Sequence, residues 1–120
     1  MNRSARIALW VAACAVACLT GCRSLDVVRS AEHRDVHDAI AVGFAFAAAE
    51  GTMNAMGFRC SRGSGSFRTE AGASASSPTH LWCEKQVPLN VACAARTQAI
   101  IVPDGATVGQ VHVFTHDNCL

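Results

Sequence analysis

The chain has 120 residues, with 10 basic and 9 acidic side chains and a formal net charge of +1. The length fits one small domain rather than several. Because the charges nearly balance and the basic residues are scattered, nothing in the electrostatics supports a nucleic-acid partner, and none is expected.

Residues 1–22 have the organisation of an export signal. Arg3 and Arg6 supply positive charge, an apolar run covers residues 7–19, and small residues stand immediately before Cys22. The sequence LTGC at 19–22 resembles the lipobox of bacterial lipoproteins. The resemblance implies that residues 1–21 are a signal peptide, that cleavage precedes Cys22, and that lipid such as palmitate is attached to the Cys22 sulfur.

The residue after the cysteine is Arg23 rather than aspartate, which in Gram-negative lipoproteins is typical of an outer-membrane address. The resemblance therefore implies a lipid-anchored protein of the outer membrane that faces the periplasm. The alternatives are an ordinary secretory signal and a transmembrane anchor. The apolar run is short for a membrane span, which favours the lipoprotein interpretation.

Residues 22–30 are expected to form a lipidated tether, followed by a small domain over residues 31–120. Ser30 can cap a helix, and strong helix formers continue from Ala31 to about Met56. Gly57 is a plausible C-terminal stop. The sequence thus predicts one N-terminal helix over residues 31–56.

This predicted helix carries two apolar stripes on nearly opposite sides. The first comprises Val42, Phe46, Ala49, Met53 and Met56, and the second comprises Val36, Ile40, Phe44, Ala47 and Gly51. A surface helix needs only one such stripe. Either the helix lies in a groove of its own domain, or one stripe contacts a protein partner, a second copy or the membrane surface.

The second half of the chain has the pattern of strands. Short alternating runs predict strands over 58–61, 80–87, 94–102 and 108–115, with a turn at Pro103-Asp104-Gly105. The segment 62–78 is rich in Gly, Ser and Ala and predicts a long mobile loop. The expected fold is α+β: one helix packed on a four-stranded antiparallel sheet.

Four cysteines remain after Cys22, and in an exported domain they favour two disulfides over a metal site. If Cys93 faces Cys119 in an antiparallel hairpin, the centre of the hairpin falls in the predicted turn. The remaining pair, Cys60 and Cys83, would then bridge the long loop, with Phe58 and Leu81 on the same face toward the helix. We predict Cys60–Cys83 and Cys93–Cys119, although four cysteines allow three pairings.

Two pairs of histidines have a spacing that can be examined for metal binding. His33 and His37 are four residues apart on the predicted helix and could share one ion, but the sequence identifies no third ligand. His112 and His116 have the same spacing on a predicted strand, where they would stand roughly 13 Å apart, too far for one ion. No cofactor is expected, and His33 and His37 are more simply solvated side chains.

The chain has no recognisable catalytic motif. The sequence GSGS at 63–66 is neither a GxSxG elbow nor a phosphate-binding loop, and no acidic pair stands out as general acid and base. An enzymatic activity is therefore not expected.

A possible partner face lies on the sheet surface opposite the helix, where His80, Trp82, His112 and Phe114 would gather. The alternative is that the 62–78 loop covers Trp82. The sequence favours a membrane-anchored envelope protein with a non-enzymatic interaction or structural role. The alternative function is a periplasmic binding module for a small ligand or a metal ion.

Overall fold

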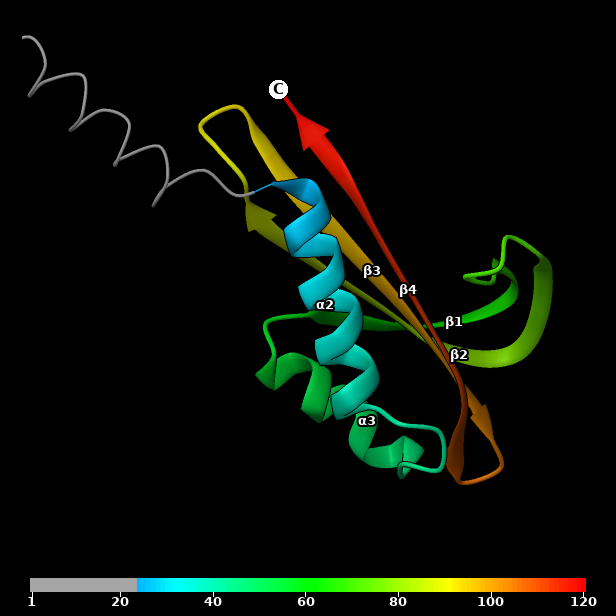
Figure 1. The fold of residues 1–120 in the computed structure, drawn as a ribbon. Coiled ribbons are helices and arrows are strands. Elements are labelled where there is room, and N and C mark those ends of the chain that lie inside the picture. Colours follow the sequence, from blue (N-terminus) through cyan, green and yellow to red (C-terminus); the bar gives the residue numbers. More distant parts are fainter. Residues whose placement is uncertain (1–23) are drawn as a thin grey trace, which may run out of the picture.

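The computed structural model describes residues 24–120, so the predicted signal peptide and Cys22 lie outside the described residues. Two helices pack on one face of a four-stranded antiparallel sheet with the strand order β1-β2-β3-β4 (Figure 1). This confirms the predicted α+β class and sheet. The elements are α2 (Leu25–Ala39), α3 (Phe46–Ala55), β1 (Arg59–Arg68), β2 (Ser74–Pro88), β3 (Cys93–Asp104) and β4 (Thr107–Cys119).

Helix α2 begins six residues before the predicted start. The side chain of Ser24, rather than that of Ser30, caps it, because the Ser24 hydroxyl accepts a hydrogen bond from the Val27 amide at 3.2 Å. Asp26 lies in the first turn, where a negative charge complements the helix dipole. Residues 25–30, predicted to be tether, are therefore the first turns of α2.

The prediction of one continuous helix over 31–56 is wrong, because the chain leaves the helical path between Ile40 and Ala45. Gly43 adopts a φ of 94°, which favours glycine. Its amide donates to the Val108 carbonyl at 2.8 Å, and the Val108 amide donates to the Phe44 carbonyl at 2.7 Å. These bonds to β4 replace helical ones, so tertiary pairing outweighs the helix propensity of an alanine-rich segment.

The break explains why two apolar stripes occur in the sequence. Ala49 and Met53 from the first stripe and Val36 and Ile40 from the second all enter one core, together with the inner face of the sheet. We call inner the face that α2 and α3 cover and outer the opposite face. The two stripes do not lie on one helix, and only Val42, 72 % exposed, is left at the surface as a large side chain. A helix-mediated partner or homodimer stays a prediction.

The strand register agrees with the prediction from the cysteines. Cys93 pairs with Cys119 and Ile101 with Val111 across β3 and β4. Both disulfides have the predicted pairing, with Cα–Cα distances of 4.0 Å for Cys60–Cys83 and 4.1 Å for Cys93–Cys119. Phe58, Leu81 and Cys83 are buried in the same inner-face core, as expected.

The predicted mobile loop over 62–78 is instead the far half of the β1–β2 hairpin. After an irregularity between Gly63 and Gly65, pairing continues to Arg68 opposite Ser74. Gly65 has a φ of 95°, and such an irregularity bends a strand. The hairpin, green in Figure 1, curves away from the long strands and toward β4. Small residues made this segment resemble a loop, but its backbone hydrogen bonds are those of a sheet.

Candidate functional site

The bent hairpin places Glu70 at the free edge of β4. Glu70 lies in the turn that joins β1 to β2, where the Thr69 amide donates to the Ala73 carbonyl at 2.8 Å. Its Oε1 accepts a hydrogen bond from the Val113 amide at 2.7 Å, and its own amide donates to His112 Nδ1 at 3.1 Å. Two separate contacts with β4 therefore fix the backbone and the carboxylate of Glu70.

Helix α2 brings two imidazoles to the same carboxylate. His33 Nε2 lies 3.2 Å from Glu70 Oε2, and His37 Nε2 lies 2.7 Å from Glu70 Oε1. The two rings stand on neighbouring turns with their centroids 4.3 Å apart. One potential ligand atom from each of the three residues falls within 4.8 Å of the other two. We call His33, His37 and Glu70 the His-Glu cluster.

The pKa values of the acid and of the neighbouring histidine follow from this packing. Burial acts to raise the pKa of Glu70, but hydrogen bonds from His37, from the Val113 amide and from His33 outweigh it and hold the pKa below its usual value. Burial lowers the pKa of His112, and the Glu70 charge only partly opposes this. A carboxylate beside a neutral His112 is therefore the favoured state.

The hydrogen bonds of His112 also define its tautomer and its role. Because Nδ1 accepts from the Glu70 amide, Nε2 carries the proton, and it donates to Gln110 Oε1 at 3.0 Å. Both ring nitrogens are thus engaged. His112 positions the hairpin turn and is not a fourth member of the His-Glu cluster. His116, four residues further along β4, is exposed and separate from it.

The predicted partner face on the outer side of the sheet is only partly present. His80 is 4 % exposed and His112 holds the Glu70 backbone, so neither histidine is offered to a partner. Phe114 is half-buried beside Phe67 of the hairpin, whereas Trp82 stays 36 % exposed. The alternative was that residues 62–78 cover Trp82. These residues do cover part of this face, but they lie over Phe114 and the histidines more than over Trp82.

Phe67 is the side chain with which the hairpin covers the outer face. It packs against Ile100 and Val102 of β3, and its ring stands 5.4 Å from His80 and 5.8 Å from His112. Within the hairpin, Gly63 of β1 lies opposite His80 of β2, and an added Cβ would stand 2.8 Å from His80 Nε2. Close packing of the bent hairpin therefore requires a glycine at this position.

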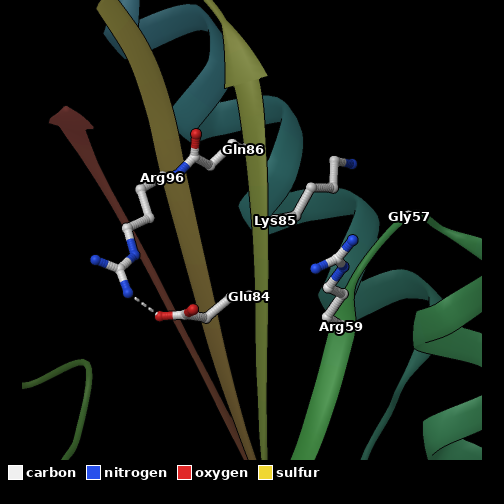
Figure 2. A pocket seen from close by; sticks show the side chains of 6 residues that line it. All are labelled: Gly57, Arg59, Glu84, Lys85, Gln86 and Arg96. Carbon is white, nitrogen blue, oxygen red and sulfur yellow. Dashed lines mark hydrogen bonds and ion pairs between the residues drawn. The ribbon is translucent and has the colours of Figure 1, made fainter. Parts of the chain in front are cut away.

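A shallow polar pocket of about 440 Å³ lies near the other half of β1 and β2 (Figure 2). Its most prominent contact is the ion pair of Glu84 with Arg96; Gln98 also donates to Glu84. Hydrogen bonding by Arg96 lowers the pKa of Glu84. In Figure 2 the Lys85 side chain points away from this pair, and it binds Glu32 of α2 at 2.9 Å. Because these groups mostly satisfy one another, the pocket has the character of a structural polar patch.

Sequence reasoning singled out His33 and His37 but missed Glu70. Nothing in the composition of residues 62–78 marks this glutamate, because its place depends on the bend at Gly63–Gly65 and on pairing with the far strand. The lipidation residue Cys22 lies outside the described residues. Within residues 24–120, no helix is long and apolar enough to cross a membrane.

No protein-family model matches the chain, and neither the curated proteins nor the solved structures contain a significant match.

Proposed function

We propose that this chain is a lipid-anchored envelope protein of the outer membrane, tethered through Cys22 and facing the periplasm, with a non-enzymatic interaction or structural role. The lipobox-like sequence LTGC at 19–22 supports lipid attachment. Two disulfides suit an oxidising compartment such as the periplasm. The observation that carries the proposal is the arrangement of apolar side chains around the start of α2.

The start of α2 is close to the residue proposed to carry lipid. Cys22 precedes the cap residue Ser24 by two positions, so their Cα atoms are at most about 7 Å apart. At this end of the domain Leu25 and Val28 pack on Leu89 of the β2–β3 turn. A lipid chain on Cys22 would therefore hold this end of the domain, and no other, against the bilayer.

The same end exposes apolar side chains. Val91 in the β2–β3 turn and the C-terminal Leu120 are fully exposed, and Val27 on the first turn of α2 is largely exposed. Leu120 is held near the turn because its amide donates to the Ala92 carbonyl at 2.9 Å. Figure 1 shows the C-terminus, the β2–β3 turn and the start of α2 at one end of the molecule. Such side chains suit contact with the interfacial region of a membrane.

The direct test is metabolic labelling of cells that express the full chain with a fatty-acid probe. The wild-type protein should be labelled and should sediment with outer membranes. Cys22→Ser should abolish labelling and leave an unprocessed precursor, whereas Cys60→Ser, which removes a disulfide cysteine, should still be labelled. Equal labelling of the Cys22→Ser and wild-type chains would rule out lipidation at this residue.

A further inference from the structure

We propose that His33, His37 and Glu70 form a binding site for one divalent transition-metal ion of the Zn²⁺ class. This site is independent of membrane anchoring. The proposal rests on the donor set, on its geometry, and on contacts that hold the carboxylate in place.

The donor set selects the class of metal. Two imidazoles and one carboxylate are typical ligands of Zn²⁺ and of related divalent ions such as Ni²⁺ and Cu²⁺, whereas Mg²⁺ and Ca²⁺ prefer oxygen ligands alone. The four cysteines of the described domain are in disulfides and supply no thiolate. The described domain therefore has no thiolate ligand to offer a metal, and the two imidazoles determine which metal ion is preferred.

The geometry is close to that of a three-ligand site. In a tetrahedral zinc site with metal–ligand distances near 2.0–2.2 Å, neighbouring ligand atoms stand about 3.3–3.5 Å apart. His33 Nε2 is 3.2 Å from Glu70 Oε2, so this pair already has nearly the required spacing. His37 Nε2 is 2.7 Å from the other carboxylate oxygen, Oε1, and one potential ligand atom from each residue lies within 4.8 Å of the other two, so shifts on the order of 1 Å bring all three to one ion. The fourth position faces solvent, because all three side chains are partly exposed.

Contacts outside the His-Glu cluster hold the carboxylate before any metal arrives. The Val113 amide donates to Glu70 Oε1, and His112 accepts from the Glu70 amide. Ligating carboxylates in metal sites are commonly held by outer hydrogen bonds of this kind, which fix their orientation. The histidines are four residues apart on a regular helix whose buried Val36 lies between them and anchors it to the core. Little rearrangement is therefore needed for binding.

An ion pair without metal is the competing explanation. In it, both histidines donate hydrogen bonds to one carboxylate, and the only role of the cluster is to join the hairpin to α2. A metal ion would replace these two hydrogen bonds with coordinate bonds from Nε2 and carboxylate oxygen, releasing any proton that Nε2 carried. The two explanations differ in one measurable quantity, the affinity of the protein for the metal alone.

The test uses the full chain, purified in detergent without a polyhistidine tag and stripped with a chelator. Zn²⁺ is titrated into it by calorimetry, and Co²⁺ is followed by its visible absorption, which reports on coordination geometry. The ligand variants are His37→Ala and Glu70→Gln; the second keeps the shape of the side chain and an acceptor for the Val113 amide. Matched controls are His116→Ala on β4 and Glu50→Gln on α3, which alter a histidine and a glutamate outside the cluster. Circular dichroism checks that every variant folds.

We expect one saturable Zn²⁺ site per chain, with no comparable binding of Mg²⁺. Saturation should raise the melting temperature on the order of 10 °C at a hundredfold excess over the dissociation constant. Loss of a residue that only supports a ligand commonly weakens metal binding at least about tenfold. His37→Ala and Glu70→Gln, which change ligands themselves, should weaken Zn²⁺ binding by at least this factor, whereas the two controls should bind like wild type. His112→Ala should weaken binding without changing the stoichiometry.

Two results would overturn the proposal. One is a wild-type chain that shows no saturable Zn²⁺ binding up to millimolar concentration. The other is equal affinity in the wild type and in a folded Glu70→Gln variant. Either result would leave the ion pair as the complete description of the cluster, and neither would bear on lipidation at Cys22.

Discussion

Glu70 at the tip of the β1–β2 hairpin accepts a hydrogen bond from the amide of Val113, 43 residues further along the chain on the opposite edge of the sheet. Two further residues of this edge have backbone groups bonded to other elements. Arg29 of α2 donates to the Thr115 carbonyl at 3.1 Å, and Val108 is bonded to the segment between the helices. An edge strand with free amides and carbonyls can pair with another chain. The hairpin, α2 and the segment between the helices therefore occupy part of the β4 edge, which leaves less of it free for association with another chain.

This arrangement predicts that Glu70→Ala loosens the hairpin without unfolding the domain. In chelator-treated protein the loss should be about 1 kcal/mol of unfolding free energy, since the bonds are charge-assisted but partly exposed. Hydrogen exchange should become faster for residues 65–77 and for the Val113 amide, and remain unchanged in α3. Glu50→Ala is the matched control. Unchanged protection of Val113 would show that the edge is held by other groups.

A second prediction concerns the close approach of β1 to β2 at Gly63, whose cross-strand partner is His80. Gly63→Ala should destabilise the domain by about 1–3 kcal/mol, because its Cβ would lie 2.8 Å from the buried His80 ring. Gly51→Ala on α3 meets nothing within 4 Å and should instead stabilise the helix by up to about 1 kcal/mol. Chemical denaturation of the two variants measures both effects. Equal stability changes in the two would show that Gly63 has room for a side chain.

The register of β3 and β4 could be predicted from sequence because a hairpin has a simple geometric rule. Once Cys93 is placed opposite Cys119, the pairs as far as Val102 opposite Gln110 follow, and the apolar side chains fall on one face by alternation; an irregularity between Val102 and Pro103 then shifts the last two pairs by one residue. The predicted turn at Pro103-Asp104-Gly105 lies close to the observed one, although Pro103 and Asp104 belong to β3 and the chain turns at Gly105 and Ala106. The turn-forming residues and the alternating apolar pattern favour the same structure as the long-range strand pairing. The predicted fold class and both predicted disulfides were therefore confirmed.

The break between α2 and α3 and the position of Glu70 could not be predicted in the same way. Residues 40–45 have the composition of a helix, but Gly43 and Phe44 form backbone hydrogen bonds with Val108 of β4 instead of helical ones. Residues 62–78 have the composition of a loop, and only the pairing of the end of β1 with the start of β2 makes most of them strand residues. Both depend on contacts distant in sequence, which outweigh local propensity. Of the candidate metal ligands, the two histidines at helical spacing were therefore visible, and the glutamate was not.

The ion pair between α2 and β2 supplies a third prediction. Glu32 is buried, its Oε1 lies 2.9 Å from Lys85 Nζ, and its Oε2 has no partner in the described residues. Lys85→Met keeps an aliphatic side chain near Phe58 but leaves the Glu32 carboxylate without a positive partner. It should lower the free energy of unfolding by about 1–3 kcal/mol. The exposed Arg34–Asp35 pair is the control, and Arg34→Met should change stability little. A double-mutant cycle with Glu32→Gln measures the coupling; additive effects would contradict a specific pair.

The two disulfides should differ in their contribution to stability. Their sequence separations of 23 and 26 residues give similar chain-entropy contributions of about 3–4 kcal/mol each. Cys83, however, is fully buried in the main core, whereas Cys93 packs at the end near the start of α2. Replacing both Cys60 and Cys83 by serine should therefore destabilise the domain more than the same change at Cys93 and Cys119, by calorimetric melting. The reverse order would show that the end of the sheet, rather than the core, limits stability.

The proposed anchoring at Cys22 predicts which end of the domain touches the bilayer. In a Trp82→Phe background, Val91→Trp and Val42→Trp each introduce a tryptophan at a strongly exposed position, one beside the start of α2 and one at the break between the helices. The processed lipoprotein is placed in vesicles that contain lipids brominated along their acyl chains, which quench nearby tryptophan. The lipid-bearing Cys22 is at most about 7 Å from Ser24 along the chain, so the lipid keeps the start of α2 at the membrane. The tryptophan at position 91 should therefore be quenched, and the one at position 42 should not. Equal quenching at both positions, or quenching at position 42 alone, would show that the domain does not rest on this end.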